Sequence, residues 1–188
     1  MSLVLHLRKM ARNNAWSNHR LHQACLKLPD VEFRATRTGF FQSIHATLNH
    51  ILPVDHYYVD ALTGGGRGPN AFYAFVPHAT MTDLAVAQAE SDRQLMGYCD
   101  ALTEQSATAS IQTDRGKSGV FTEQCDDLLA HLFQHQIHHR GQVHNMLSGT
   151  SVAPPQLDEY FLAFDTLARA PEVEQAGIGG AETVVAPS

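Results

Sequence analysis

The sequence predicts an all-α protein built as an antiparallel four-helix bundle. Four long stretches carry apolar residues at helical spacing, and turn-rich breaks containing glycine and proline separate them. The length of 188 residues suits one domain that buries a substantial core without needing disulfides or a structural metal. Long amphipathic helices joined by such connections are expected to pack side by side and bury their apolar stripes together.

Capping residues and helix breakers set the expected boundaries. In chain order, the long helices are predicted over about Leu3–Leu28, from Thr36 or Thr38 to Thr63, from Thr80 or Thr82 to Thr103, and over Thr122–Leu147. Pro29, the glycine-rich loop of residues 64–70 and the pair Ser148-Gly149 mark the breaks between or after them.

Two smaller elements complete the expected fold. Residues 111–121 place β-prone side chains around a glycine-containing turn, which predicts a small β-hairpin before the fourth long helix. After a pair of prolines, residues 156–170 predict a short C-terminal helix. From Pro171 onward the chain is rich in Gly, Ala and Val and has no periodicity. We therefore expect a helical domain over residues 1–170 and a disordered tail over residues 171–188.

Composition excludes several classes of function. The formal net charge of -6 argues against nucleic acid or an anionic membrane as the main partner. No apolar run reaches the ~20 residues of a membrane span, and the N-terminus lacks the features of a signal peptide, so we expect a cytoplasmic protein. The three cysteines are far apart, as expected for reduced thiols. The chain has no GxSxG, P-loop, GxGxxG or CxxC motif.

Histidines are concentrated in the segment HLFQHQIHHRGQVHNML, residues 131–147. His131, His135 and His139 lie four residues apart and form one row along a helix. His135 and His139 flank the apolar stripe, and two imidazoles at this spacing can hold one divalent ion if another helix supplies a further ligand. The alternative is a polar helix face with solvated rings.

The second predicted helix offers His45, His50 and His56 as the further ligand. A helical wheel places His45 and His56 beside an apolar stripe that begins at Phe41, and it places His50 nearly opposite. Pro53 is expected to kink the helix near His50 and so to alter which face is inward. Periodicity alone favours His45.

Three segments make the sequence similar to a known family. LNHILPVDHYYVDAL, the histidine-rich segment and the opening NNAWSNHRL resemble the DinB/YfiT-like superfamily of four-helix-bundle metalloproteins, over most of the chain. The resemblance implies a metal site formed by His50, His135 and His139. It therefore favours His50 over His45 as the ligand from the second predicted helix. It also implies zinc or nickel, a homodimer and, in some relatives, a low-molecular-weight thiol such as bacillithiol or mycothiol as a reaction partner.

Such a site predicts a function. Three neutral imidazoles leave a divalent ion with a position for a thiol or water, whose pKa the ion lowers. We expect a metal-dependent enzyme acting on a small molecule, either thiol transferase-like or hydrolase-like. The alternative is a non-catalytic module for metal binding or dimerisation. The candidates for orienting the ligand rings are Asn18, Asp55, Gln142 and Asp158. Arg140 is a candidate to pair with an acid across the bundle or across a dimer interface.

Overall fold

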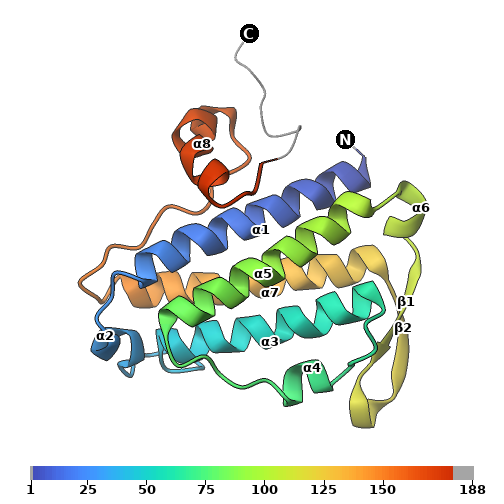
Figure 1. The fold of residues 1–188 in the computed structure, drawn as a ribbon, viewed down its shortest axis with the longest axis horizontal. Coiled ribbons are helices and arrows are strands. Elements are labelled where there is room, and N and C mark those ends of the chain that lie inside the picture. The colour runs from blue at the N-terminus through green and yellow to red at the C-terminus, as the bar shows by residue number, and fades with distance from the viewer. Residues whose placement is uncertain (1, 180–188) are drawn as a thin grey trace.

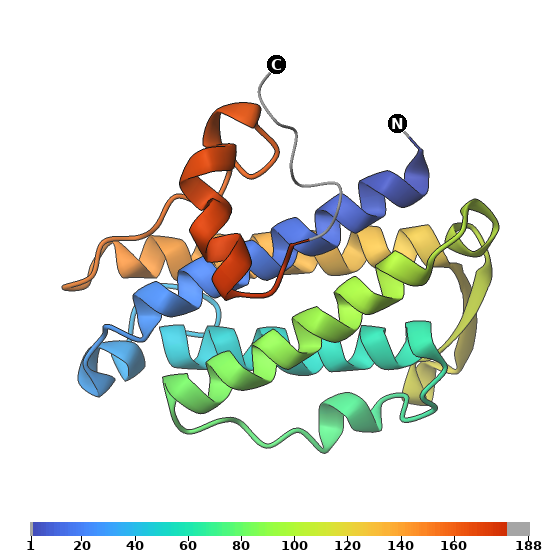
Figure 2. The ribbon, with the colours of Figure 1, turned by 45° about the horizontal axis from the view of Figure 1, so that its top comes forward.

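The computed structural model describes residues 2–179 of the chain. Four long helices of this part form a bundle (Figures 1 and 2): α1 (Leu3–Cys25), α3 (Ile44–Thr63), α5 (Met81–Ala101) and α7 (Cys125–Leu147). Helices α1 and α3 each pack against both α5 and α7, so that the four helices surround one core. The predicted all-α four-helix bundle is therefore confirmed.

The connections decide which neighbouring helices are antiparallel. Arg8, near the start of α1, donates to the carbonyl of Asp100 near the end of α5 at 2.9 Å, so α1 and α5 are antiparallel. Helices α3 and α7 are likewise antiparallel (Figure 1). In contrast, α3 and α5 begin at the same end, because His45 contacts the carbonyl of His78 just before α5. The connection over residues 64–80 thus crosses back along the bundle and makes α3 and α5 parallel.

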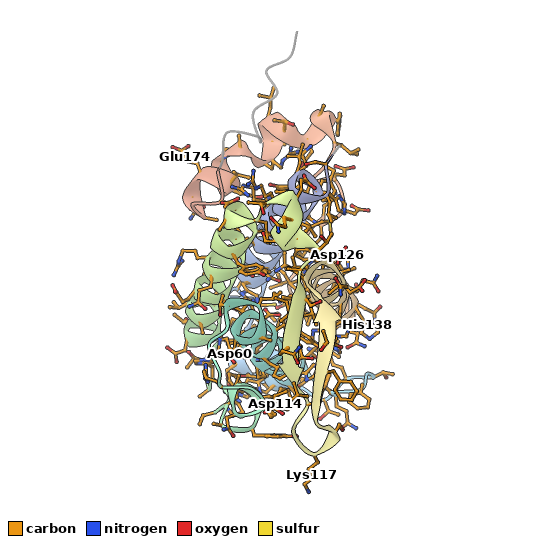
Figure 3. The ribbon with its side chains drawn as sticks, turned by 90° about the vertical axis from the view of Figure 1, so that its right-hand side faces the viewer. Asp60, Asp114, Lys117, Asp126, His138 and Glu174 are labelled. Carbon is orange, nitrogen blue, oxygen red and sulfur yellow. The ribbon has the colours of Figure 1, made fainter. Side chains whose placement is uncertain are left out.

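Shorter elements fill the connections. They are α2 (Asp30–Arg34), α4 (Asn70–Tyr73), α6 (Glu104–Ala107), β1 (Ser110–Asp114), the 3-10 turn η1 (Gly116–Ser118) and β2 (Val120–Gln124). Strands β1 and β2 form an antiparallel hairpin, and Figure 3 shows Lys117 at its tip. The predicted β-hairpin before the fourth long helix is confirmed.

Two helices begin later than predicted. Helix α3 begins at Ile44 rather than at Thr36 or Thr38, because Ser43 accepts a hydrogen bond from the backbone N–H of Ala46 at 3.0 Å and so caps it. Helix α7 begins at Cys125, because the residues around Thr122 continue the hairpin as β2. Thr80 caps α5, one of the two predicted positions. Helix α1 ends at Cys25 rather than Leu28, and α5 ends at Ala101 rather than Thr103.

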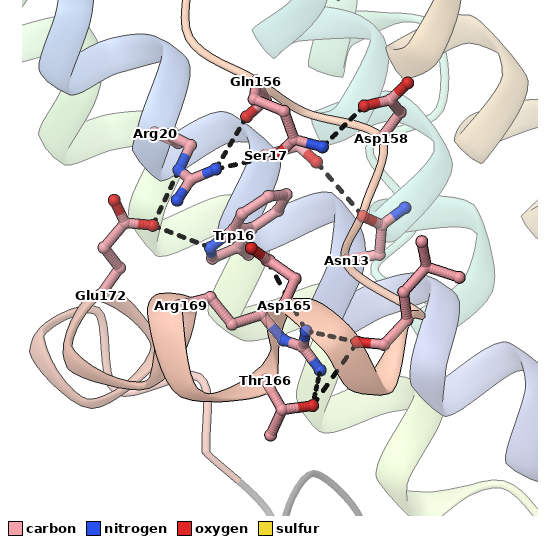
Figure 4. A network of polar contacts seen from close by, with 11 residues as sticks. Asn13, Trp16, Ser17, Arg20, Gln156, Asp158, Asp165, Thr166, Arg169 and Glu172 are labelled. Atoms are coloured by element: carbon pink, nitrogen blue, oxygen red, sulfur yellow. Dashed lines mark hydrogen bonds and ion pairs between the residues drawn. The ribbon is translucent and has the colours of Figure 1, made fainter.

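The C-terminal segment differs most from the prediction. A 3-10 turn, η2 (Ala163–Asp165), leads into α8 (Thr166–Gln175), which continues through Pro171 into the segment predicted to be disordered. The helix continues because it docks on α1: Trp16 and Arg20 donate to the carboxylate of Glu172 at 3.0 and 2.8 Å (Figure 4). The remainder of the predicted tail, residues 180–188, lies outside the described residues.

Polar side chains separate two apolar parts of the core. One apolar cluster includes Trp16 and Leu129, and the other includes Leu21 and Val143. Buried polar residues lie near the boundary between the two clusters on every long helix. We call them the polar layer: Asn14, Asn18, Asp55, Gln88, Asp92, Gln136 and Arg140. Among the described residues, no helix combines the length and apolar character needed to cross a membrane.

Candidate metal centre

Three histidines meet between α3 and α7. His50 lies near the start of α3, and His135 and His139 lie on successive turns of α7. One ring nitrogen from each residue lies within 4.8 Å of the others, and the Nε2 atoms of His50 and His135 are 3.1 Å apart. The structure therefore brings together the three residues that the family resemblance implied. We call them the histidine cluster.

The other candidate histidines lie outside this cluster. The Nε2 atom of His45 is 3.0 Å from the carbonyl oxygen of His78, so this ring is held by the connection that precedes α5. The ring of His56 lies 6.1 Å from that of Phe75. His131 is exposed and lies beside Tyr58, with its ring centroid 6.4 Å from that of His135. It is therefore a neighbour of the cluster.

The environment keeps the cluster neutral. Burial, together with the nearby His139, lowers the pKa of His50 to about 4. Burial and the surrounding histidines lower the pKa of His135 to about 3. Burial also lowers the pKa of His139. All three imidazoles are thus unprotonated at neutral pH, which is the state that coordinates a metal ion.

Two neighbouring side chains hold rings of the histidine cluster in place. The Nδ1–H of His139 donates to Gln142 at 2.9 Å, which leaves Nε2 as the lone-pair nitrogen. The amide of Gln142 in turn lies 3.0 Å from His138, on the outer side of α7 (Figure 3). The ring of Phe41 stacks on that of His50 with centroids 4.2 Å apart. Gln42 follows with a left-handed φ of 58°, a strained conformation in the loop that positions Phe41.

The donor set fits a borderline transition metal. Zinc–nitrogen bonds of ~2.0–2.1 Å in tetrahedral geometry would place two ligand nitrogens about 3.3 Å apart. The facing Nε2 atoms of His50 and His135 are 3.1 Å apart, close to this spacing. Imidazole nitrogens suit zinc or nickel, whereas calcium and magnesium prefer oxygen ligands. Within the described residues no fourth His, Cys, Asp or Glu joins the group.

Only one of the four candidates for orienting the rings contacts a ligand, and it is Gln142. Asp55 and Asn18 instead belong to the polar layer, where Asp55 accepts from Gln88 at 2.7 Å. Asp158 accepts a hydrogen bond from Gln156, whose oxygens accept from Arg20 of α1 (Figure 4).

Arg140 also belongs to the polar layer. Its guanidinium donates to Asn14, to Asn18 at 3.0 Å and to Gln136 at 3.2 Å. Asp92 and Asp55 raise the pKa of Arg140 through their charge, against the larger effect of burial, which lowers it to about 10. The acids expected to pair with it across the bundle therefore act at longer range, and amide side chains make the direct contacts.

A cavity of about 370 Å³ lies beside the histidine cluster, and His135 forms part of its wall. Aromatic rings dominate the remainder, including Tyr57 and Tyr58 of α3 and Phe72 and Tyr73 of α4. The sequence predicts that Phe41 belongs to the apolar stripe of the second helix, and it predicts no role for Phe72. The available signal was the concentration of aromatic residues in two connecting segments, FF at 40–41 and AFYAF at 71–75.

A comparison with protein-family models gives a match over most of the chain. A model of the DinB family matches residues 1–173, a range that contains the four long helices and the three histidines. No curated protein matches the chain. The family and the histidine cluster together fit a metal-binding protein.

Proposed function

The chain belongs to the DinB family, and we propose that it is a divalent-metal-dependent enzyme whose ligands are His50, His135 and His139. The observation that carries the proposal is the convergence of three neutral imidazole nitrogens, one of which belongs to His135 in the wall of an adjoining cavity of about 370 Å³. A structural site usually has four protein ligands, whereas a catalytic site keeps a position for substrate. Three protein ligands beside a cavity therefore favour catalysis over a purely structural role.

The proposed reaction is thiol transfer or hydrolysis on a small molecule. A zinc or nickel ion at this site supplies a Lewis acid that lowers the pKa of a thiol or water. The protein holds its ligands in place: Gln142 fixes the ring of His139, and Phe41 covers one face of His50. His139 is buried and His50 is partly buried, which limits the access of bulk water to the reacting group.

Metal content tests the ligand assignment. Elemental mass spectrometry on tag-free protein, before and after loading with zinc or nickel, should give near-stoichiometric metal for wild type. His50→Ala and His139→Ala should lose it. His45→Ala is the matched control, because His45 lies on the same helix but bonds the carbonyl of His78. Retention of metal by His50→Ala, or its absence from loaded wild type, would overturn the assignment.

A second measurement separates an enzyme from a structural metal site. Cobalt-loaded protein should change its visible absorption when 2-mercaptoethanol or azide is added, because either can occupy the remaining coordination position. A spectrum unchanged by both would favour the alternative function, a non-catalytic metal-binding or interaction module.

We also propose a homodimer. The family resemblance implies it, and an exposed apolar surface near the C-terminus supports it. Phe164 and Leu167 are 86% and 78% exposed, and they lie close in sequence to the half-exposed Phe161 and Leu162. Light scattering at micromolar concentration should give twice the mass of the chain, and a monomeric mass would contradict the proposal.

A further inference from the structure

The cavity beside His135 has the character of a site for a planar ligand. Tyr57 and Tyr58 come from α3, Phe72 and Tyr73 come from α4, and His135 comes from α7. Tyr57 is held rigidly, because its hydroxyl donates to the carbonyl of Asp114 at 2.7 Å. Rings from three separate elements therefore border one space, which suits an aromatic ligand because offset and edge-on ring contacts are favourable.

Two of these rings are more exposed than is usual for large aromatic side chains. Tyr73 is 76% exposed and Phe72 is 38% exposed, whereas Trp16, the only tryptophan, is fully buried. The ring of Phe72 lies 6.4 Å from that of His50. Its apolar surface is thus placed within reach of a molecule that occupies the cavity beside the histidine cluster.

A polar group stands at the edge of the same cavity. The guanidinium of Arg115 donates to the Tyr58 hydroxyl at 3.0 Å and to both carboxylate oxygens of Glu123 at 2.9 Å. Tyr58 therefore accepts one hydrogen bond, and its own O–H donates to none of the described residues. A phenol that accepts from a cation and has an unused proton is a good donor to an incoming carbonyl or carboxylate oxygen.

We propose that this cavity binds an aromatic carbonyl or carboxylate compound of one or two rings. Its rings pack between the tyrosines of α3 and Phe72, and an oxygen of the compound accepts from Tyr58. The volume of about 370 Å³ lies within the range of small-molecule sites. The inference deepens the proposed function, because it names the substrate class for the site that His135 adjoins.

Binding of 2-naphthoate to metal-free protein tests the inference, with its saturated analogue decahydro-2-naphthoate as the matched ligand. Titration calorimetry or ligand-observed NMR should show binding of the aromatic compound at least fivefold tighter than that of the saturated one. Tyr58→Phe should weaken 2-naphthoate binding roughly fivefold, since it removes one hydrogen bond. Phe72→Ala should weaken it to a similar extent.

Phe164→Ala is the control, because Phe164 is an exposed ring outside the cavity and its loss should leave binding unchanged. Equal affinity for the two ligands, or unchanged binding by both Tyr58→Phe and Phe72→Ala, would overturn the inference. The conservative Tyr58→Phe keeps the test valid if Phe72→Ala proves unstable.

The two proposals fail in different ways. Loaded protein that retains metal through the three histidines but shows no aromatic preference would overturn the inference and leave the proposed function standing. Protein that binds 2-naphthoate with the expected variant effects but holds no metal would overturn the proposed function and leave the aromatic site standing.

Discussion

The histidine cluster and the polar layer occupy adjacent faces of α7, yet their polar atoms are used in opposite ways. His135 and His139 meet His50 of α3, whereas Gln136 and Arg140, each the next residue in the chain, enter the polar layer. In the polar layer the protein supplies the partners: Asn14 and Asn18 donate to Asp92, and Arg140 donates to the oxygens of both amides. In the histidine cluster, unprotonated nitrogens face one another.

This difference indicates how to distinguish a structural polar group from a ligand site inside one bundle. Buried donors and acceptors that satisfy one another fix the relative positions of the helices, because each misplacement would leave one of them unpaired. Lone pairs that converge without donors are instead suited to a cation. His50 and His135 illustrate the contrast, because their Nε2 atoms face each other 3.1 Å apart.

Removing Arg140 should have the largest effect on stability. Arg140→Ala leaves the amide oxygens of Asn14 and Asn18 without their donor. It also removes the positive charge near the buried carboxyl groups of Asp55 and Asp92, so we expect a loss of about 3–5 kcal/mol in the free energy of unfolding. Urea denaturation measures this loss. The control is Arg93→Ala, which breaks a half-exposed pair with Glu90 and should cost no more than about 1 kcal/mol. A loss below that value for Arg140→Ala would mean that the polar layer does not hold the bundle together.

Replacing Asp55 should produce a smaller, pH-dependent increase in the free energy of unfolding. Burial and the charge of Asp92 raise the pKa of Asp55 from 3.8 to about 7. The folded protein therefore binds this proton up to about pH 7, whereas the unfolded chain releases it near pH 4. The free energy of unfolding consequently falls as the pH rises between these values, and it stays lower above pH 7.

Asp55→Asn removes this loss of stability at high pH, because the new side chain does not ionise. Its amide oxygen can still accept from Gln88 and Gln136. We expect a stabilisation on the order of 2 kcal/mol at pH 8 that disappears near pH 4. Denaturation at a series of pH values measures it, with Asp158→Asn, an exposed position, as the control. An Asp55→Asn protein less stable than wild type at pH 8 would show that the carboxylate is needed in its charged form.

The smallest expected effect concerns the orientation of a ligand ring. Gln142→Ala removes the acceptor of the His139 Nδ1–H, and should weaken zinc binding about tenfold, or ~1.4 kcal/mol. Competition with a chromophoric chelator measures the affinity, and Gln134→Ala, on the exposed side of α7, is the control. Equal zinc affinities for the two variants would mean that Gln142 does not contribute to metal binding.

Spacing alone predicted part of the candidate site. His135 and His139 could be paired from the sequence, because residues four apart on a helix face the same way. His50 could not, and the helical wheel favoured His45. The wheel counted Phe41 in the apolar stripe, but α3 begins only at Ile44. Helix α3 also packs against both α5 and α7, so its buried surface is wider than one stripe.

Contacts between distant residues account for what the sequence could not predict. Asn18 and Asp92 are 74 positions apart, and Asn14 and Arg140 are 126 apart, so local patterns carry no information on these pairs. The same holds for α8. Local rules predict a break near Pro171, but Glu172 accepts hydrogen bonds from residues of α1 more than 150 positions away, and these contacts hold the helix in place.

The connection between α3 and α5 contributes to the cavity wall but contains none of the three residues of the histidine cluster. The histidine cluster lies on α3 and α7, whereas Phe72 and Tyr73 belong to a connection between long helices. Connections tolerate insertion and replacement far better than packed helices do. Exchanging residues 64–78 for segments of other length or composition would therefore alter the cavity wall that Phe72 and Tyr73 form and leave the histidine cluster unchanged. For protein engineering, the four long helices would be kept and the connection between α3 and α5 would be exchanged.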